Sequence, residues 1–177
     1  MTKEIPLTNG GVALVDAEDF ERVSQYTWSN TGGYAKSNMR LPSGNKERMH
    51  RFILGITDAA IEVDHINHDT LDNRRSNLRQ ATRQQNTMHR RKYDGKSTPY
   101  KGVSLNQRLG KYLVFITVNG VQHYLGCHED LVTAARCYDA HAIQHFGPFA
   151  LLNFPDGEHL TVEEANAMTR RRAKRGA

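Results

Sequence analysis

The stretch from Val63 to Asn86 carries the side chains of this sequence that are best suited to chemistry: Asp64, His65, Asn77 and Asn86. A neutral imidazole accepts a proton near neutral pH, so His65 is suited to act as a general base on water. The oxygens of Asp64 and Asn86 are hard ligands, which Mg²⁺ or Mn²⁺ prefers, whereas Zn²⁺ favours histidine and cysteine. Together these groups suit metal-assisted hydrolysis of a phosphodiester bond.

The same stretch has the pattern of a short hairpin followed by a helix. Its middle is rich in Asn, Asp and Thr, which favour turns. Thr82 and Gln85 have the spacing of a capping box, which marks the start of a helix. We therefore expect a strand, a loop, a second strand and a helix, at Glu62–Ile66, Asn67–Ser76, Leu78–Ala81 and from Thr82 to about Arg91.

This layout resembles the HNH nuclease motif, with His65 as the first histidine, Asn77 as the middle asparagine and Asn86 in the third position. The H-N-N form is similar to that of phage and intron-encoded homing endonucleases. The resemblance implies that His65 and Asn77 are catalytic, with Asn77 fixing the orientation of His65. It also implies Mg²⁺ or Mn²⁺ on Asp64 and Asn86, and double-stranded DNA as the substrate. One site per chain would nick DNA as a monomer or cut both strands as a homodimer, and the sequence leaves both open.

The order of Asp64 and His65 raises a geometric question. Consecutive residues of a regular strand point to opposite faces, yet both side chains must reach one phosphate. We therefore expect either a bent or twisted strand at these residues, or a phosphate that straddles the strand edge.

Positive charge is concentrated around this motif. The formal net charge of the 177 residues is +5, and no Asp or Glu occurs between Arg74 and Lys92. Clustered Lys and Arg residues are what a polyanion-binding surface needs. We predict DNA contacts by Arg51, Arg74, Arg75, Arg79, Arg83, Arg90, Arg91 and Lys92.

The segment from Tyr100 to Pro155 predicts an antiparallel sheet packed on one helix. Lys111–Val118 is rich in β-branched and aromatic residues, and the Asn119–Gly120 pair favours a tight hairpin turn. After it, apolar residues recur every three or four positions from Leu131 to Phe146. The sequences YKGV, YLG and AARCYDAHAIQHFG make this segment resemble the DNA-binding domain of plant ethylene-response factors, which is also found appended to phage homing endonucleases. That resemblance implies DNA contacts by Lys101, Arg108, Lys111, Tyr112, Gln122 and His123.

The whole chain is predicted to be of the α+β class. We expect an N-terminal mixed module, the ββα-metal (HNH) unit, a linker, the ethylene-response-factor-like domain, and a short helix with a basic tail, at residues 1–51, 52–92, 93–99, 100–155 and 156–177. A capping box at Thr161 and Glu164 marks the last helix. The role of the N-terminal module stays open at this stage.

Composition limits the remaining alternatives. The sequence has no long apolar run and no charged-then-apolar leader, so we expect an intracellular protein with no membrane partner. The resemblance to phage homing endonucleases implies a phage-encoded protein in the cytoplasm of a bacterial host. Cys127 and Cys137 form no Cys-x-x-Cys pair, so no structural zinc is expected. The alternative functions are a non-catalytic, sequence-specific DNA-binding or regulatory protein, and an RNA-binding protein. The complete set of motif residues disfavours the first, and the aromatic content of 8% disfavours the second.

Overall fold

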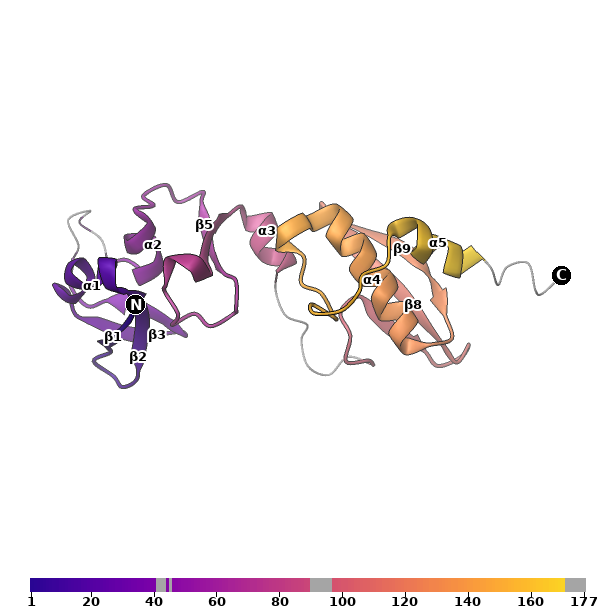
Figure 1. Cartoon of the computed structure of the whole chain (residues 1–177), viewed down its shortest axis with the longest axis horizontal. Coiled ribbons are helices and arrows are strands. Elements are labelled where there is room, and N and C mark those ends of the chain that lie inside the picture. The colour runs from indigo at the N-terminus through magenta and orange to yellow at the C-terminus, as the bar shows by residue number, and fades with distance from the viewer. Residues whose placement is uncertain (41–43, 45, 90–96, 171–177) are drawn as a thin grey trace. The chain divides into compact units, whose positions relative to one another are not determined.

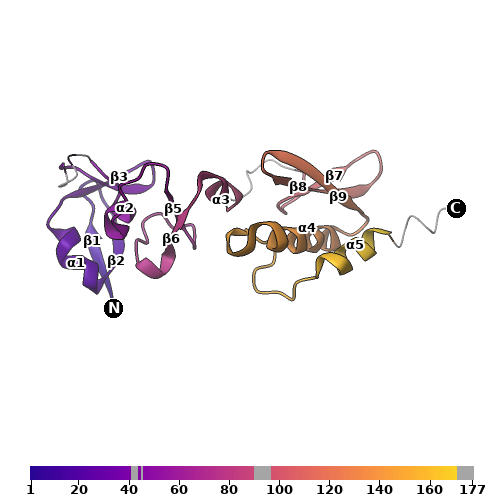
Figure 2. The same cartoon turned by 90° about the horizontal axis from the view of Figure 1, so that it is seen from above.

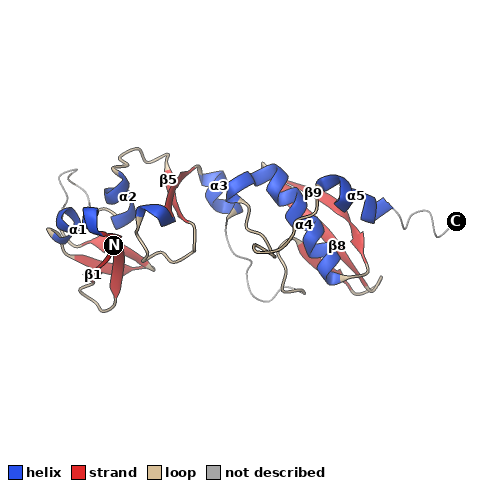
Figure 3. Ribbon diagram, viewed as in Figure 1, coloured by secondary structure: helices blue, strands red, loops and turns tan. Residues whose placement is uncertain are grey.

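The computed structural model describes residues 1–40, 44, 46–89 and 97–170. The fold is of the mixed α+β class, with small antiparallel sheets and several helices (Figures 1 and 3). The chain divides into two compact units, Met1–Asn86 and Thr87–Ala177. Within the described parts, none of the helices combines the length and the apolar character needed to cross a membrane.

The N-terminal unit begins with two hairpins and two short helices. They are β1 (Thr2–Pro6), β2 (Val12–Asp16), α1 (Ala17–Ser24), β3 (Trp28–Thr31), β4 (Tyr34–Ser37) and α2 (Met49–Leu54). β1 pairs with β2, and β3 with β4, both antiparallel. Trp28, Met49 and Ile53 are almost fully buried in the core that these elements share. The unit thus has a hydrophobic core of its own, to which the next hairpin adds Val63 and Leu78.

That hairpin consists of β5 (Glu62–His65) and β6 (Leu78–Ala81), followed by α3 (Arg83–Met88). A single 3₁₀ turn, η1 (Arg75–Asn77), leads into β6. The expected capping box is present, because the Thr82 backbone N–H donates to Gln85 Oε1 at 2.8 Å and the Gln85 N–H donates to Thr82 Oγ1 at 3.2 Å. The predicted end of this helix, near Arg91, lies outside the described residues.

The C-terminal unit is a three-stranded antiparallel sheet with one long helix packed on it. Its elements are β7 (Val103–Asn106), β8 (Lys111–Val118), β9 (Val121–His128), α4 (Leu131–Phe146), η2 (Gly147–Phe149) and α5 (Val162–Arg170). The strand order is β7-β8-β9, and Figure 2 shows α4 running along one face of this sheet. Asn119 and Gly120 have positive φ values of 53° and 80°, as a tight β8–β9 turn requires.

Gly102 lies at the closest approach between the β7 segment and α4. Its φ is +75°, and a Cβ at this position would lie 1.9 Å from Cδ2 of Tyr138. Both the backbone conformation and the contact therefore require glycine.

We expect Gly102→Ala to lower the free energy of unfolding by about 3 kcal/mol or more, because it combines an unfavourable φ with overpacking. Gly110→Ala is the matched control, since its φ is +60° but no atom lies within 4 Å of its Cβ position. That variant should lose only about 1 kcal/mol. Urea denaturation of both proteins tests this, and equal losses would contradict it.

Candidate active site

The pairing of β5 with β6 decides which side chains share a face. Asp64 pairs with Arg79, and His65 pairs with Leu78, in an antiparallel register without a recorded irregularity. Because side chains alternate along a strand, Glu62 and Asp64 lie on one face and His65 lies on the other, with buried Leu78. The pairing register is therefore that of a regular hairpin, with no bulge at Asp64 or His65. A twist of the strand and a phosphate that binds across its edge both stay predictions.

The two predicted metal ligands both have partners in the structure. Arg79 Nε donates to Asp64 Oδ2 at 2.8 Å, and Arg79 Nη2 lies 2.6 Å from the same oxygen. Asn86 Nδ2 donates to Glu62 Oε2 at 2.6 Å. Both contacts lie on the same face of the hairpin, so the structure brings Asp64 and Asn86 to one side of it.

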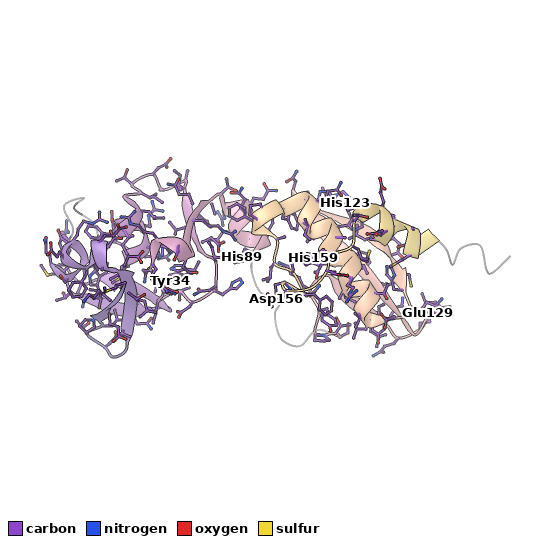
Figure 4. The ribbon with its side chains drawn as sticks, viewed as in Figure 1. Tyr34, His89, His123, Glu129, Asp156 and His159 are labelled. Atoms are coloured by element: carbon purple, nitrogen blue, oxygen red, sulfur yellow. The ribbon has the colours of Figure 1, made fainter. Side chains whose placement is uncertain are left out.

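His65 is enclosed by side chains of the N-terminal module. It is only 4% exposed, and its ring centroid lies 5.0 Å from that of His50 and 6.1 Å from that of Tyr34. Tyr34 comes from β4 and is labelled in Figure 4, and His50 comes from α2. Nε2 of His65 is buried without a hydrogen-bond partner among the described residues. A buried ring nitrogen without a partner is uncommon in a folded protein and is compatible with a role in proton transfer.

The surroundings keep both imidazoles uncharged. Burial lowers the pKa of His65 below its usual 6.5, although Asn73 and Asp64 oppose this change. No hydrogen bond of normal geometry joins Asn73 to the ring, and Asn73 Oδ1 is itself buried without a partner. Burial and then the neighbouring His65 lower the pKa of His50 to about 3. A neutral His65 is the form that can accept a proton.

Asn77 connects the ends of the loop between β5 and β6. Its Nδ2 donates to the backbone oxygen of Asp72 at 2.8 Å, and its Oδ1 accepts the N–H of Asn67 at 2.9 Å. Its backbone oxygen also accepts the N–H of Ile66, the residue after His65. These contacts hold the chain that directly follows His65 at the end of β5.

Several of the predicted DNA-binding arginines make internal contacts. Arg51 donates to the carbonyl oxygens of Ile61 and Asp58 at 2.6 and 2.7 Å. Arg74 Nη2 lies 2.6 Å from Asp72 Oδ2, and Arg79 is held by Asp64 as described. Arg83 on α3 is exposed. Arg90, Arg91 and Lys92 lie outside the described residues.

Arg75 also contacts a group of three carboxylates near the N-terminus. Asp16, Glu18 and Asp19 bring their oxygens within 4.8 Å of one another. Arg75 Nε lies 2.8 Å from Asp19 and 3.0 Å from Glu18, and its backbone N–H donates to Asp16. The guanidinium lowers the pKa of Asp19 against the opposing effect of burial. The contacts of Arg75 thus join η1 to α1.

In the C-terminal unit, the predicted DNA contacts differ in exposure. Lys101 differs from the other predicted cationic contacts. Its Nζ donates to the backbone oxygen of Met88, and burial lowers its pKa to about 8. Lys111 Nζ lies 3.5 Å from Glu129 Oε1. Tyr112 packs against the hydrophobic core of the C-terminal unit. The exposed predicted contacts are Arg108, Gln122 and His123; His123 and Glu129 are labelled in Figure 4.

Three residues that the structure places at this site are not among the predicted site residues: Tyr34, His50 and Glu62. In the sequence, Tyr34 is typical of a core position, His50 suits either packing or a contact near the scissile bond, and Glu62 belongs to the expected strand. Nothing in the local pattern links His50 or Tyr34 to His65, because these contacts form between distant segments. Glu62, two residues before Asp64, could have been found from the period of two along the strand.

The segment that contains this hairpin also matches known proteins. A family model described as HNH endonuclease matches residues 41–88, which span α2, the hairpin and α3. An uncharacterized HNH endonuclease of Acanthamoeba polyphaga mimivirus is 33% identical over 150 residues, covering 81% of this chain and 75% of that protein. The chain belongs to the HNH endonuclease family. The matched range begins before β5, so it includes the α2 segment with His50.

Two further relatives of the chain are plant proteins. Both are AP2-like ethylene-responsive transcription factors of Arabidopsis thaliana. They are 36% identical over 70 residues and 31% identical over 86 residues, which cover 34% and 42% of this chain. The chain spans only 23% and 20% of their lengths, so the likeness concerns one segment of each.

Proposed function

We propose that this HNH endonuclease is a metal-dependent DNA endonuclease of the H-N-N, homing type, built around a ββα-metal unit. His65 is its general base, Asn77 orients His65, and Asp64 and Asn86 hold the metal. The observation that carries the proposal is the buried, unpartnered Nε2 of His65 at the end of a family-defining hairpin whose other face carries Asp64. Such a nitrogen needs a proton donor, and the attacking water is one.

The donor set is suited to a hard divalent cation. No hydrogen bond to Asn86 Oδ1 is found among the described residues, so this oxygen is available as a ligand. Arg79 is paired with Asp64 Oδ2, so a metal on this carboxylate would bind beside the guanidinium or displace it. Oxygen donors favour Mg²⁺ or Mn²⁺. When bound, such an ion would supply charge stabilisation at the phosphate and the leaving oxygen.

The residues of the chain divide the remaining tasks between the two faces of β5. His65 is the last residue of the strand, so a phosphate at this end can be reached from both faces. His65 Nε2 takes the proton of the attacking water, while His50 and Tyr34 limit the rotation of its ring. Asp64 and Asn86 act from the opposite face. With this arrangement, Asp64 and His65 can both reach one phosphate without a bend in the strand, although they lie on opposite faces of it.

We infer that the C-terminal unit is an ethylene-response-factor-type domain that holds double-stranded DNA. Its β7-β8-β9 sheet with α4, and the likeness to AP2-like factors, support this assignment. Arg108, Gln122 and His123 are exposed and are the best candidates for contact. Lys101 is less suited, because its Nζ is bound to Met88. Binding should weaken with salt, because each neutralised phosphate releases counterions.

A plasmid assay tests the proposed activity directly. Supercoiled DNA should become open-circular or linear in the presence of Mg²⁺ or Mn²⁺, and a chelator should stop the reaction. A non-catalytic DNA-binding protein, the alternative function, would shift the plasmid in a gel without cutting it. Cleavage that persists in excess chelator would contradict the metal-dependent mechanism.

The pKa of His65 predicts the pH dependence of cleavage. Because burial lowers this pKa below 6.5, the ring stays neutral and able to accept a proton at pH values where an exposed histidine would be protonated. The rate should therefore fall to half its maximum at a pH below 6.5. Single-turnover nicking across a pH series at saturating Mn²⁺ measures this, and a midpoint above 6.5 would contradict it.

A further inference from the structure

We propose that Glu62 is a positioning residue for metal binding, because its carboxylate fixes the side-chain amide of Asn86 so that Oδ1 is the ligand atom. This inference rests on the proposed pairing of Asp64 and Asn86 at the metal. It gives a task to a residue that neither the motif nor the comparisons single out. The ligand class is a hard divalent cation, with Mn²⁺ as the probe.

Glu62, Asp64 and Asn86 lie on one face of the hairpin. Glu62 and Asp64 are two residues apart on β5, so strand alternation puts them on the same face. Asn86 comes from α3, and its amide meets Glu62 at 2.6 Å. Glu62 thus connects the helix that carries one proposed ligand with the strand that carries the other.

The contact between Glu62 and Asn86 determines which end of the amide faces the carboxylate. An ionised carboxylate can only accept hydrogen bonds, whereas an asparagine amide has one donating end, Nδ2, and one accepting end, Oδ1. Glu62 therefore selects the amide orientation in which Nδ2 faces it and Oδ1 points away. In that orientation Oδ1 has no protein hydrogen bond among the described residues. The reversed amide would set Oδ1 against a carboxylate and offer the metal an N–H group, which cannot coordinate it.

The orientation of the Asn86 amide should affect the affinity for the metal. A side chain that holds a ligand in the binding orientation typically changes metal affinity by about 10–100-fold when it is removed. The effect arises from the hydrogen bond that holds the Asn86 amide in place. A glutamine at position 62 can accept from Nδ2 or donate to Oδ1, so it allows two amide orientations and should weaken metal binding only about twofold. Reach and charge can be separated by substitution, because glutamine keeps the reach and aspartate keeps the charge.

The experiment measures the dissociation constant of Mn²⁺ for the full chain without DNA, from the free-ion signal in electron paramagnetic resonance. We expect Glu62→Ala and Glu62→Asp to bind Mn²⁺ about tenfold or more weakly, and Glu62→Gln to stay within about threefold of the wild type. Glu4→Ala and Glu4→Gln are matched controls, since Glu4 is an exposed glutamate on β1. Thermal unfolding without metal confirms that each variant is folded.

The outcomes separate this inference from the proposed function. Unchanged affinity in Glu62→Ala, or an equal loss in Glu62→Gln and Glu62→Ala, would overturn the positioning role. The aspartate and glutamine variants keep the test decisive if Glu62→Ala does not fold. If Asp64→Ala and Asn86→Ala bind Mn²⁺ as the wild type does, the proposed metal site itself is wrong. If they lose binding and the Glu62 variants do not, only the inference about Glu62 fails.

Discussion

Replacing His65 with alanine should lower the rate constant of DNA cleavage by about 10²–10⁴-fold and leave DNA affinity nearly intact. The reason is that the imidazole removes a proton during the reaction but, at 4% exposure, offers little surface to bound DNA. Single-turnover nicking of supercoiled plasmid gives the rate constant, and gel retardation of the same plasmid in chelator gives the affinity. Cleavage at the wild-type rate would remove His65 from the mechanism.

The control for this variant must separate catalysis from folding. His65 packs against His50 and Tyr34, so its truncation also leaves space in a buried cluster. His145→Ala removes an exposed imidazole from α4 and should cleave normally. Thermal unfolding of His65→Ala shows what fraction is folded at the assay temperature. A loss of cleavage that merely follows a loss of folded protein would count against a role in proton transfer.

The local elements of this protein could be read from the sequence because local signals determine them. The Thr82–Gln85 capping box and the Asn119–Gly120 turn form as expected. The residues of Arg48–Leu54 suit either a strand or a helical turn, and Met49–Leu54 is helical. β1 was not predicted, because Thr2–Pro6 has only one buried residue, Ile5, to reveal it.

The residues of the candidate site can be proposed from the sequence, but their contacts cannot. The residue types of Asp64, His65 and Asn86 carry their own chemistry, so type and spacing are sufficient to propose them. Their partners come from packing between segments far apart in sequence, such as His50 on α2 beside His65. A clustered run of arginines predicted DNA binding, yet Arg75 reaches back to α1 to bind Asp19. Composition cannot distinguish an arginine on the surface from one that holds two elements together.

Disrupting the ion pair between Asp64 and Arg79 should produce the second large effect. Variants of the two residues can separate an effect on stability from an effect on cleavage. Their side chains are only 6% and 17% exposed, so removing one partner leaves a poorly solvated charge. Asp64→Ala should lower the free energy of unfolding by about 2–4 kcal/mol and the cleavage rate by about 10²–10³-fold. Urea denaturation and plasmid nicking measure the two effects on the same preparation.

The double variant Asp64→Ala/Arg79→Ala decides which effect explains the loss of cleavage. Removing both charges should recover most of the lost stability, since neither member of the ion pair is then left without the other. Cleavage should stay as low as in Asp64→Ala, because the proposed metal ligand is still missing. A double variant that regains cleavage together with stability would show that Asp64 only neutralises Arg79. If instead stability returns and cleavage does not, the carboxylate has a task in the reaction that is independent of its ion pair.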